Sequence, residues 1–423
     1  MAESWLGLDF GSSGARAVVI GRQAEVLAEA HLDWGGPDPE RLAQDWRETL
    51  FELISQIPFT YRTDLRAVAI AGTSSTSLLC DAENRPLLPP LLYNDARAEH
   101  EVQTLRDIAP PDHVTLSATS SLAKLLWLQR QPGVRSARHF THQADWLATL
   151  LHGRPGISDY HNSLKLGYDV EAMRYPDWLL KLPVAPLLPQ VVEPGTVIGP
   201  VLDGMAKKLG VAKDCQIHAG TTDSIAAFLA AGATQPGQAV TSMGSTLVLK
   251  LLSTSRVEAA EYGVYSHKLG KLWLAGGASN AGGAVLRAFF SDEQLRVLSK
   301  RIDPATQSGL DYYPLLGAGE RFPVNNPALQ PRLTPRPADD VTFLQGLLEG
   351  MARIEAHGYK LLEQLGATRL QSVLSAGGGA ANPAWSAMRQ KELGMPVQAA
   401  KHGEAAYGAA LLAAGGTKLL CFE

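Results

Sequence analysis

Asp9 is the first residue whose position could do chemistry, because its carboxylate stands in an apolar run two residues before the turn Gly11-Ser-Ser-Gly14. A carboxylate in such a run is costly unless it is paired, hydrogen-bonded or bound to a metal. Beside a turn rich in backbone N–H groups, it could hold Mg²⁺ directly or through water. It could equally form an Asx turn that stabilises a hairpin. The residues themselves leave both interpretations open.

Asp223 is a second candidate, in the segment His218-Ala-Gly-Thr-Thr-Asp-Ser224. This segment follows a strand-like run and precedes the helical run 225–231. An aspartate at such a junction is often a plain helix N-cap. It could also be a general base that projects from the carboxyl end of a strand. Sequence position does not choose between the two.

Two polar segments could bind the hydroxyls of a polyol. Asp95 and Arg97 lie in Tyr93-Asn-Asp-Ala-Arg97 and offer an acceptor and several donors, although a solvated loop with a local ion pair explains them as well. Ser74 lies in the run Thr73-Ser-Ser-Thr-Ser77 at the end of an apolar strand, and such runs are usually turns. Among the tryptophans, mostly expected in the core, Trp46 and Trp273 could offer a flat apolar face to a sugar ring.

The glycine run Gly377-Gly-Gly379 would let the backbone approach a ligand closely. It follows a strand and precedes a helix, but it is not in the G-x-G-x-x-G register of a dinucleotide-binding turn. The G-x-x-x-x-G-K-[ST] motif is absent, as are H-E-x-x-H, C-x-x-C and G-x-S-x-G. The sequence therefore lacks support for a P-loop, a zinc hydrolase or an α/β-hydrolase site.

Strand-like and helical runs alternate along the chain, which predicts α/β layers. Residues 6–20 and 239–252 repeat one pattern, an apolar strand, a tight Gly/Ser/Thr turn and a second apolar strand. Each predicts a hairpin whose tip can face an anion, and together they suggest two related domains with a boundary near 234–237. The proline-rich stretch 322–338 is interpreted as a surface excursion. Strands are expected within 18–20, 67–70, 239–241 and 372–374, and helices within 122–129, 342–365 and 384–393.

Composition limits the class of protein. The 423 residues predict two or three domains at roughly 150 residues each. A net charge of -4 provides no basic field for nucleic acid or for an anionic membrane surface. Three scattered cysteines without paired spacing, no basic leader and no run of 18 apolar residues predict a cytoplasmic protein with reduced thiols and no membrane partner.

Taken together and in order, six segments resemble the FGGY family of carbohydrate kinases. They are the first hairpin Leu6–Arg16, the sugar segment Tyr93–Arg97 with Tyr in place of Trp, the aspartate segment Gly220–Ser224, the second hairpin Thr241–Thr246, the Gly-Glu-Arg element Leu315–Arg321, and the glycine loop Ser375–Asn382. Within that family the segments 158–165 and 276–283 are most similar to short pentulose kinases of cyanobacterial and plant type that act on D-ribulose.

The resemblance implies the two-domain, actin-like (ribonuclease H-like) α/β fold of sugar kinases, with a cleft between the domains. Residues 1–230, joined by the C-terminal helix 404–423, would form the sugar and catalytic side, and residues 231–403 the ATP side. The implied chemistry is transfer of a phosphoryl group from Mg²⁺-bound ATP to a pentulose, most simply D-ribulose. A xylulose, polyol or glycerol kinase, or a nucleotide-binding switch without catalysis, are the alternatives.

The resemblance also implies a role for each candidate residue. Asp223 would be the general base, and Asp9 and Asp223 would lie near the metal. The protein would act as a monomer or a homodimer on two small molecules, the sugar and ATP. The sugar would meet Asp9, Ser74, Asp95, Arg97 and Asp223, and ATP would meet Gly11, Ser12, Ser13, Arg16, Gly244, Ser245, Thr246, Gly378, Gly379 and Asn382.

Overall fold

The computed structural model describes residues 3–34 and 38–415 of the chain. These residues divide into two compact units. Unit 1 contains the described residues up to Ala230 and those from Glu404 onward, and unit 2 contains Ala231–Gly403. The division falls at the end of helix α9, a few residues before the stretch 234–237 where the sequence suggested a boundary. The last eight residues of the expected C-terminal helix lie outside the described part.

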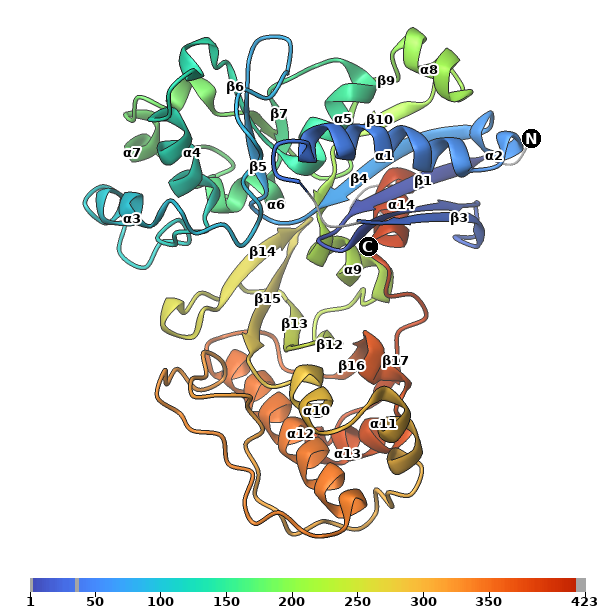
Figure 1. The fold of residues 1–423 in the computed structure, drawn as a ribbon, viewed down its shortest axis with the longest axis vertical. Coiled ribbons are helices and arrows are strands. Elements are labelled where there is room, and N and C mark those ends of the chain that lie inside the picture. Colours follow the sequence, from blue (N-terminus) through green and yellow to red (C-terminus); the bar gives the residue numbers. More distant parts are fainter. Residues whose placement is uncertain (1–2, 35–37, 416–423) are drawn as a thin grey trace. The chain divides into compact units, whose positions relative to one another are not determined.

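Unit 1 is built on a mixed sheet of seven strands in the order β3-β2-β1-β4-β10-β9, with β11 also paired to β4 (Figure 1). The predicted first hairpin is present as the antiparallel pair β1 and β2. Strands β1, β10 and β11 all run parallel to β4, so their carboxyl ends meet at one edge. The strands are β1 (Ser4–Phe10), β2 (Gly14–Ile20), β3 (Val26–Asp33), β4 (Leu65–Gly72), β9 (Val197–Pro200), β10 (Gln216–His218) and β11 (Thr221–Thr222).

Helices cover this sheet, and one of them comes from the far end of the sequence. Helix α14 (Ala405–Gly415) packs on β1, β2 and β4. The approach is so close that a Cβ on Gly7 would lie 2.0 Å from the carbonyl oxygen of Ala406. Any larger residue at this position of β1 would push α14 away. Helix α9 (Asp223–Ala231) packs beside α14, and α1 (Leu42–Gln56), α5 (Gln143–His152) and α8 (Asp203–Leu209) cover the other face of the sheet.

The rest of unit 1 carries the polar segments between β4 and β10. It has two small sheets, β5 (Ser77–Cys80) with β6 (His139–His142), and β7 (Ile157–Asp159) with β8 (Gln190–Val192). Its own apolar core brings together Leu79, Leu122, Leu125 and Phe140. The helices here are α3 (Glu99–Arg106), α4 (Ser121–Gln129), α6 (Tyr160–Ser163) and α7 (Asp177–Leu180), while the short α2 (Phe59–Arg62) precedes β4 and lies against the end of α8.

Unit 2 has a six-stranded sheet in the order β14-β15-β13-β12-β16-β17. The predicted second hairpin is the antiparallel pair β12 and β13, and β16 runs parallel to β12 on its other side. The strands are β12 (Gln238–Met243), β13 (Leu247–Ser253), β14 (Tyr265–Leu269), β15 (Leu272–Ser279), β16 (Ser372–Ala376) and β17 (Val397–Ala399). The helices are α10 (Gly283–Phe289), α11 (Asp292–Ser299), α12 (Asp340–Gln364) and α13 (Pro383–Leu393).

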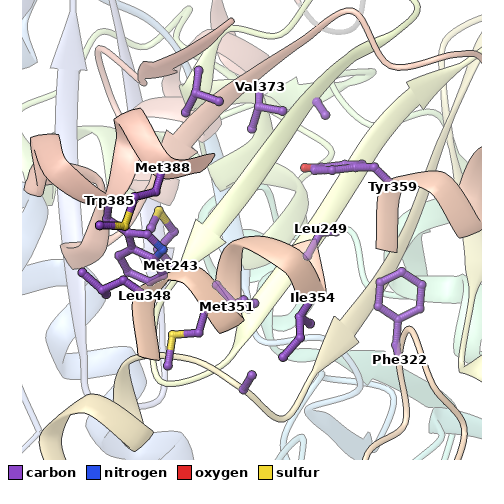
Figure 2. Packing of buried hydrophobic residues seen from close by; sticks show 14 of the residues in the cluster. Met243, Leu249, Phe322, Leu348, Met351, Ile354, Tyr359, Val373, Trp385 and Met388 are labelled. Atoms are coloured by element: carbon purple, nitrogen blue, oxygen red, sulfur yellow. The ribbon is translucent and has the colours of Figure 1, made fainter. Parts of the chain in front are cut away.

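The core of unit 2 packs α12 and α13 against this sheet. Figure 2 shows Met243 of β12 beside Leu348 of α12 and Met388 of α13. Burying a side chain of this size contributes about 1.5–3 kcal/mol. Phe322 is also fully buried here. The proline-rich stretch 322–338 is therefore not a pure surface excursion, because its first residue anchors it in the core.

The two tryptophans considered as sugar platforms are core residues instead. Trp46 is 1% exposed and packs against Trp146, with their ring centroids 6.5 Å apart. Trp273 is buried on β15. The sequence could not show this, because an aromatic residue has the same local pattern in a core and in a binding face. In the described part of the chain, no helix is long and apolar enough to cross a membrane.

Candidate active site

The tip of the first hairpin is held by backbone hydrogen bonds. The Gly11 N–H donates to the Gly14 carbonyl at 2.9 Å, which closes the turn. Trp34, at the end of β3, fixes it from outside: its indole Nε1 donates to the Gly11 carbonyl at 2.9 Å, and its backbone N–H donates to the Ser13 carbonyl at 3.0 Å. Ser12 and Ser13 are exposed. The tip is therefore rigid, with its two hydroxyls turned to solvent.

Three of the predicted residues meet at one edge of the unit 1 sheet. Asp9 lies near the end of β1 opposite Ala71 of β4, and Thr221 of β11 lies opposite the same residue on the other side. Ser74 follows the end of β4, and Asp223 follows the end of β11. The structure thus brings together residues 9, 74 and 223, at the kind of edge where open α/β sheets bind ligands.

Asp9 is in an unfavourable environment for a lone carboxylate. Its Oδ1 is buried and has no hydrogen-bond partner in the described structure. Burial is the main reason that the pKa of Asp9 is raised to about 8, and repulsion by Asp223 and Glu404 adds to it, while Arg16 opposes the rise. Three carboxylates with one cation in reach form a site that a further positive charge would stabilise.

Asp223 is the first residue of α9, and its Oδ1 accepts a hydrogen bond from the backbone N–H of Ser224 at 2.6 Å. The carboxylate is half-buried. The bond to Ser224 joins neighbouring residues, so it orients the carboxylate but is not the contact of an N-cap side chain to the second or third N–H of a helix. The place beside Asp9 agrees with the general-base interpretation.

Arg16 and Glu404 form an ion pair that the sequence did not indicate. Arg16 is the cross-strand partner of Asp9 in the first hairpin, and its guanidinium binds the carboxylate of Glu404. The carbonyl of Glu404 accepts the N–H of Tyr407 in the first turn of α14. Residues almost 400 positions apart are thereby joined beside Asp9. No local pattern around Glu404 predicts this contact.

In the Tyr93–Arg97 segment, Asp95 and Arg97 form the local ion pair that the sequence allowed. The Arg97 Nε donates to Asp95 Oδ1 at 2.9 Å, and its Nη2 lies 2.9 Å from Oδ2. The Arg97 guanidinium also lies over the ring of Trp127, 5.3 Å from its centroid. Asp95 is largely buried, and Arg97 is half-exposed. The pair is pre-arranged, and donors of Arg97 still face solvent.

In unit 2 the second hairpin and the glycine loop lie against each other. The turn Gly244-Ser245-Thr246 follows β12, and a Cβ on Gly377 would lie 2.9 Å from the carbonyl oxygen of Met243, directly before that turn. Gly377 has a φ of +82°, which favours glycine. Gly378 and Gly379 continue into a short 3₁₀ helix, and Asn382 ends it. Two of the segments predicted to bind ATP are therefore neighbours.

Asn382 has a structural role. Its Oδ1 accepts the N–H of Trp385 at 3.1 Å and caps α13, and its Nδ2 donates to Ser299 Oγ at 2.9 Å. A capping asparagine of this kind typically stabilises its helix by about 1 kcal/mol. The side chain already makes two protein contacts, so a contact to a nucleotide would have to use its remaining donor and acceptor capacity.

A buried ion pair underlies the unit 2 segments and was not predicted. Arg389 of α13 and Glu355 of α12 are each 1% exposed and are joined by two hydrogen bonds of 2.5 and 2.7 Å. Arg389 also donates to Ser375 Oγ at 2.6 Å, and Thr241 Oγ1 donates to Glu355. The pair thus connects two helices with β12 and β16. An arginine inside an otherwise apolar helical face was the available signal.

Within the described residues, no group of three or more His, Cys, Asp or Glu side chains is placed to hold a metal ion by itself. The carboxylates of Asp9, Asp223 and Glu404 influence one another without forming a complete ligand set.

Comparison with known proteins agrees with this arrangement. Residues 4–230 match the N-terminal domain of the FGGY family of carbohydrate kinases, and residues 239–416 match its C-terminal domain. A xylulose kinase of Escherichia coli (strain K12) is 27% identical and aligns over 97% of this chain and 89% of its own. An autoinducer-2 kinase of Yersinia enterocolitica is 25% identical, with 98% of this chain and 86% of the relative aligned.

Solved structures show the same fold. A xylulose kinase from Rhodospirillum rubrum superposes with a TM-score of 0.81 at 23% identity, covering 98% of this chain and 90% of that one. A glycerol kinase from Plasmodium falciparum, solved with ADP, superposes with a TM-score of 0.84 at 15% identity, covering 99% and 90%. The two-domain α/β prediction is confirmed. The chain therefore belongs to the FGGY family of carbohydrate kinases, which transfer a phosphoryl group from ATP to a sugar.

Proposed function

We propose that this kinase phosphorylates a pentulose, with Asp223 as the general base. The observation that carries the proposal is the meeting of Asp9, Ser74 and Asp223 at the carboxyl ends of three parallel strands. Two carboxylates and a hydroxyl at one edge provide a base, an anchor for a cation and a donor to a sugar. In this assignment unit 1 is the sugar and catalytic side, and unit 2 is the ATP side.

The reaction itself requires little covalent work from the protein. The terminal hydroxyl of the sugar attacks the γ-phosphorus of ATP, its proton passes to the Asp223 carboxylate, and the bond from the γ-phosphorus to the bridging oxygen breaks to release ADP. The hydrogen bond from the Ser224 N–H to Oδ1 helps to orient the Asp223 carboxylate for that transfer. Asp223 then returns the proton to solvent.

Mg²⁺ fits the environment of Asp9. The unpartnered Oδ1 and the repulsion from Asp223 and Glu404 indicate a missing positive charge. Asp9 would hold the ion, with Asp223 nearby, and water would complete the ligand set. When bound, the ion would neutralise charge on the phosphoryl oxygens. Asp9 would thereby become an ionised carboxylate, since a cation lowers the pKa of its ligand.

ATP would contact backbone groups rather than a lysine-bearing P-loop. On unit 2 we assign the turn Gly244-Ser245-Thr246 to the phosphates and the loop with Gly378, Gly379 and Asn382 to the nucleoside, because the structure places this turn and loop side by side. On unit 1 the phosphates would meet the tip formed by Gly11, Ser12 and Ser13, with Arg16 behind it. Asp95 and Arg97 would hold sugar hydroxyls together with Ser74.

Two pentuloses have support from different observations. The segments 158–165 and 276–283 resemble kinases of D-ribulose. The relatives from Escherichia coli and Streptomyces coelicolor, 27% and 28% identical, are named xylulose kinases. The two sugars differ in the orientation of one hydroxyl, which side-chain placement reads and motifs do not. We therefore propose a pentulose site and rank D-xylulose beside D-ribulose.

A sugar panel tests the proposal. ADP release from purified protein with Mg²⁺ and ATP would be followed for D-ribulose, D-xylulose, glycerol, gluconate and an autoinducer-2 precursor. We expect the highest kcat/KM for one of the two pentuloses. A higher kcat/KM for a non-pentulose would overturn the substrate assignment and leave the kinase assignment intact.

The metal assignment has its own test. Asp9→Asn keeps the size of the side chain and removes its charge, so we expect a higher Mg²⁺ concentration for half-maximal activity. Glu25→Gln is a matched control, because Glu25 lies at the far end of the β2–β3 hairpin. An unchanged Mg²⁺ titration of Asp9→Asn would remove Asp9 from the metal site.

A further inference from the structure

Lys124 is a fully buried lysine in the middle of α4 (Ser121–Gln129). Its flanking residues Leu122, Ala123, Leu125 and Leu126 are also buried, so the ammonium group stands inside an apolar helix environment. Lysine is almost never fully buried unless its charge is compensated. The partners of its Nζ therefore show what the residue is for.

Both hydrogen-bond acceptors of Lys124 are backbone carbonyls in different loops. Its Nζ donates to the Ser75 carbonyl at 2.8 Å and to the Leu92 carbonyl at 2.6 Å. Ser75 follows Ser74 in the loop after β4, and Leu92 directly precedes the Tyr93–Arg97 segment. One ammonium group thus joins the two loops to which we assign sugar contacts.

Each loop needs such support for a separate reason. Ser75 has a φ of +66°, a left-handed conformation that costs free energy for a residue other than glycine. The Leu92 carbonyl also accepts the backbone N–H of Asp95 at 3.0 Å, so Lys124 and Asp95 share one acceptor. Without Lys124, both carbonyls would lose a charged hydrogen-bond donor. The two loops would then no longer be held at a fixed distance from each other.

The next turn of α4 supports the same site. Trp127 lies three residues after Lys124, hence on the same side of the helix, and its ring lies under the Arg97 guanidinium. The helix is itself anchored at its start: Ser120 caps it through the Ala123 N–H, and Ser121 Oγ lies 3.1 Å from Nε2 of the buried His142. A single fixed helix therefore contacts both sugar segments.

We propose that Lys124 is a positioning residue that sets the spacing between the Ser74 loop and the Asp95–Arg97 segment, and that Trp127 orients Arg97 from the same helix. The inference rests on the proposed function, because it assigns a supporting role to groups that we place at the sugar. Lys124 itself is not assigned a contact with sugar, ATP or metal.

The test separates the KM for sugar from the KM for ATP. Lys124→Met keeps the length and the apolar stem and removes the donors. We expect the KM for the preferred sugar to rise about 10- to 100-fold, as expected for groups displaced by roughly 1 Å, while the KM for ATP changes less than about twofold. Trp127→Leu, at a partly exposed position, should give a smaller rise in the same direction.

Tyr175→Phe is the matched control. It removes another hydrogen bond from a side chain to a backbone carbonyl in unit 1, that of Tyr175 to Pro189, and it touches neither sugar loop. Equal changes in the two KM values of Lys124→Met, or no change in either, would overturn the proposal. If Lys124→Met does not fold, Trp127→Leu decides by the same KM criterion.

The two proposals fail in different ways. If the wild-type protein phosphorylates no sugar of the panel, the proposed function is overturned and the role of Lys124 falls with it. If the wild type is active and both variants leave the ratio of the two KM values unchanged, only the positioning role is overturned.

Discussion

The hairpin β1–β2 of unit 1 and the hairpin β12–β13 of unit 2 share a sequence pattern and differ in their charges. Around the first tip lie the carboxylates of Asp9, Asp223 and Glu404 with the guanidinium of Arg16. Beside the second tip, residues 244–246, one charged group binds the turn, because the Arg287 guanidinium donates to Ser245 Oγ at 3.1 Å. The carbonyls of this tip at Gly244 and Ser245 accept the N–H groups of residues 283 and 284 at 2.9 and 3.1 Å.

The ion pairs near the two tips also differ in how deeply they are buried. Beside the first tip, Arg16 and Glu404 are paired at the surface, with about half of each side chain exposed. Beneath the second, Arg389 and Glu355 are paired in the interior. The charged groups beside the first tip are therefore accessible to solvent, whereas those beneath the second tip are buried and join helices to strands. The following experiments test that contrast.

Activity should depend far more on Asp223, at the edge of the unit 1 sheet, than on Ser245, in the tip of the second hairpin. Asp223→Asn is expected to lower kcat by about 10²–10⁴-fold, because the general base is lost while the size of the side chain is kept. Ser245→Ala should lower kcat/KM less than about tenfold, the effect of one hydrogen bond. Steady-state ADP release measures both. Comparable losses in the two variants would contradict the contrast.

Stability should show the reverse. Arg389→Met leaves Glu355 as a buried unpaired charge and should lower the free energy of unfolding by about 3–5 kcal/mol. Arg16→Met breaks a surface pair and should lower it by less than about 1 kcal/mol. Urea denaturation measures both values. The double variant Arg389→Met with Glu355→Leu should recover part of the loss, and no recovery would show that packing rather than charge explains it.

The glycine loop should be sensitive in function as well as in stability. Gly377→Ala places a Cβ 2.9 Å from the Met243 carbonyl oxygen at a φ of +82°, which should cost about 1–3 kcal/mol and raise the KM for ATP. Gly232→Ala is the control, with a φ of +85° and no atom within 4 Å of the new Cβ. An equal rise in the KM for ATP in both variants would remove Gly377 from the nucleotide side.

The buried cation of unit 1 should make stability depend on pH. Burial lowers the pKa of Lys124 to about 7, with Asp95 opposing and Lys165 adding to the shift. Between about pH 7 and 10 the unfolded chain keeps a proton that the folded chain has released. The free energy of unfolding therefore rises with pH in this window, by at most about 1.4 kcal/mol per pH unit.

Comparison with Lys124→Met isolates that contribution. The difference in unfolding free energy between wild type and variant should grow as the pH rises from 7 to 10, measured by urea denaturation at several pH values. A difference that stays constant over this range would show that Lys124 keeps its proton in the folded state.

The features that could be predicted from the sequence were those marked by a pattern of neighbouring residues. The two hairpins followed from apolar runs around Gly/Ser/Thr turns, and both are confirmed as antiparallel pairs. Asp9 and Asp223 were visible because each interrupts or ends such a run. Trp46 lies in the core, as expected for most of the tryptophans, and its alternative use as a sugar platform is excluded by packing against Trp146, a contact between distant segments.

The sequence by itself determined the alternation of strands and helices, the paired hairpin pattern and the types of residue available for phosphoryl transfer, because these depend on local periodicity and on side-chain chemistry. Only the tertiary structure decided that β1, β4 and β11 end side by side, that Glu404 returns to Arg16, and that Lys124 joins two loops. These contacts depend on strand order and burial, and neither is encoded in any single stretch of chain.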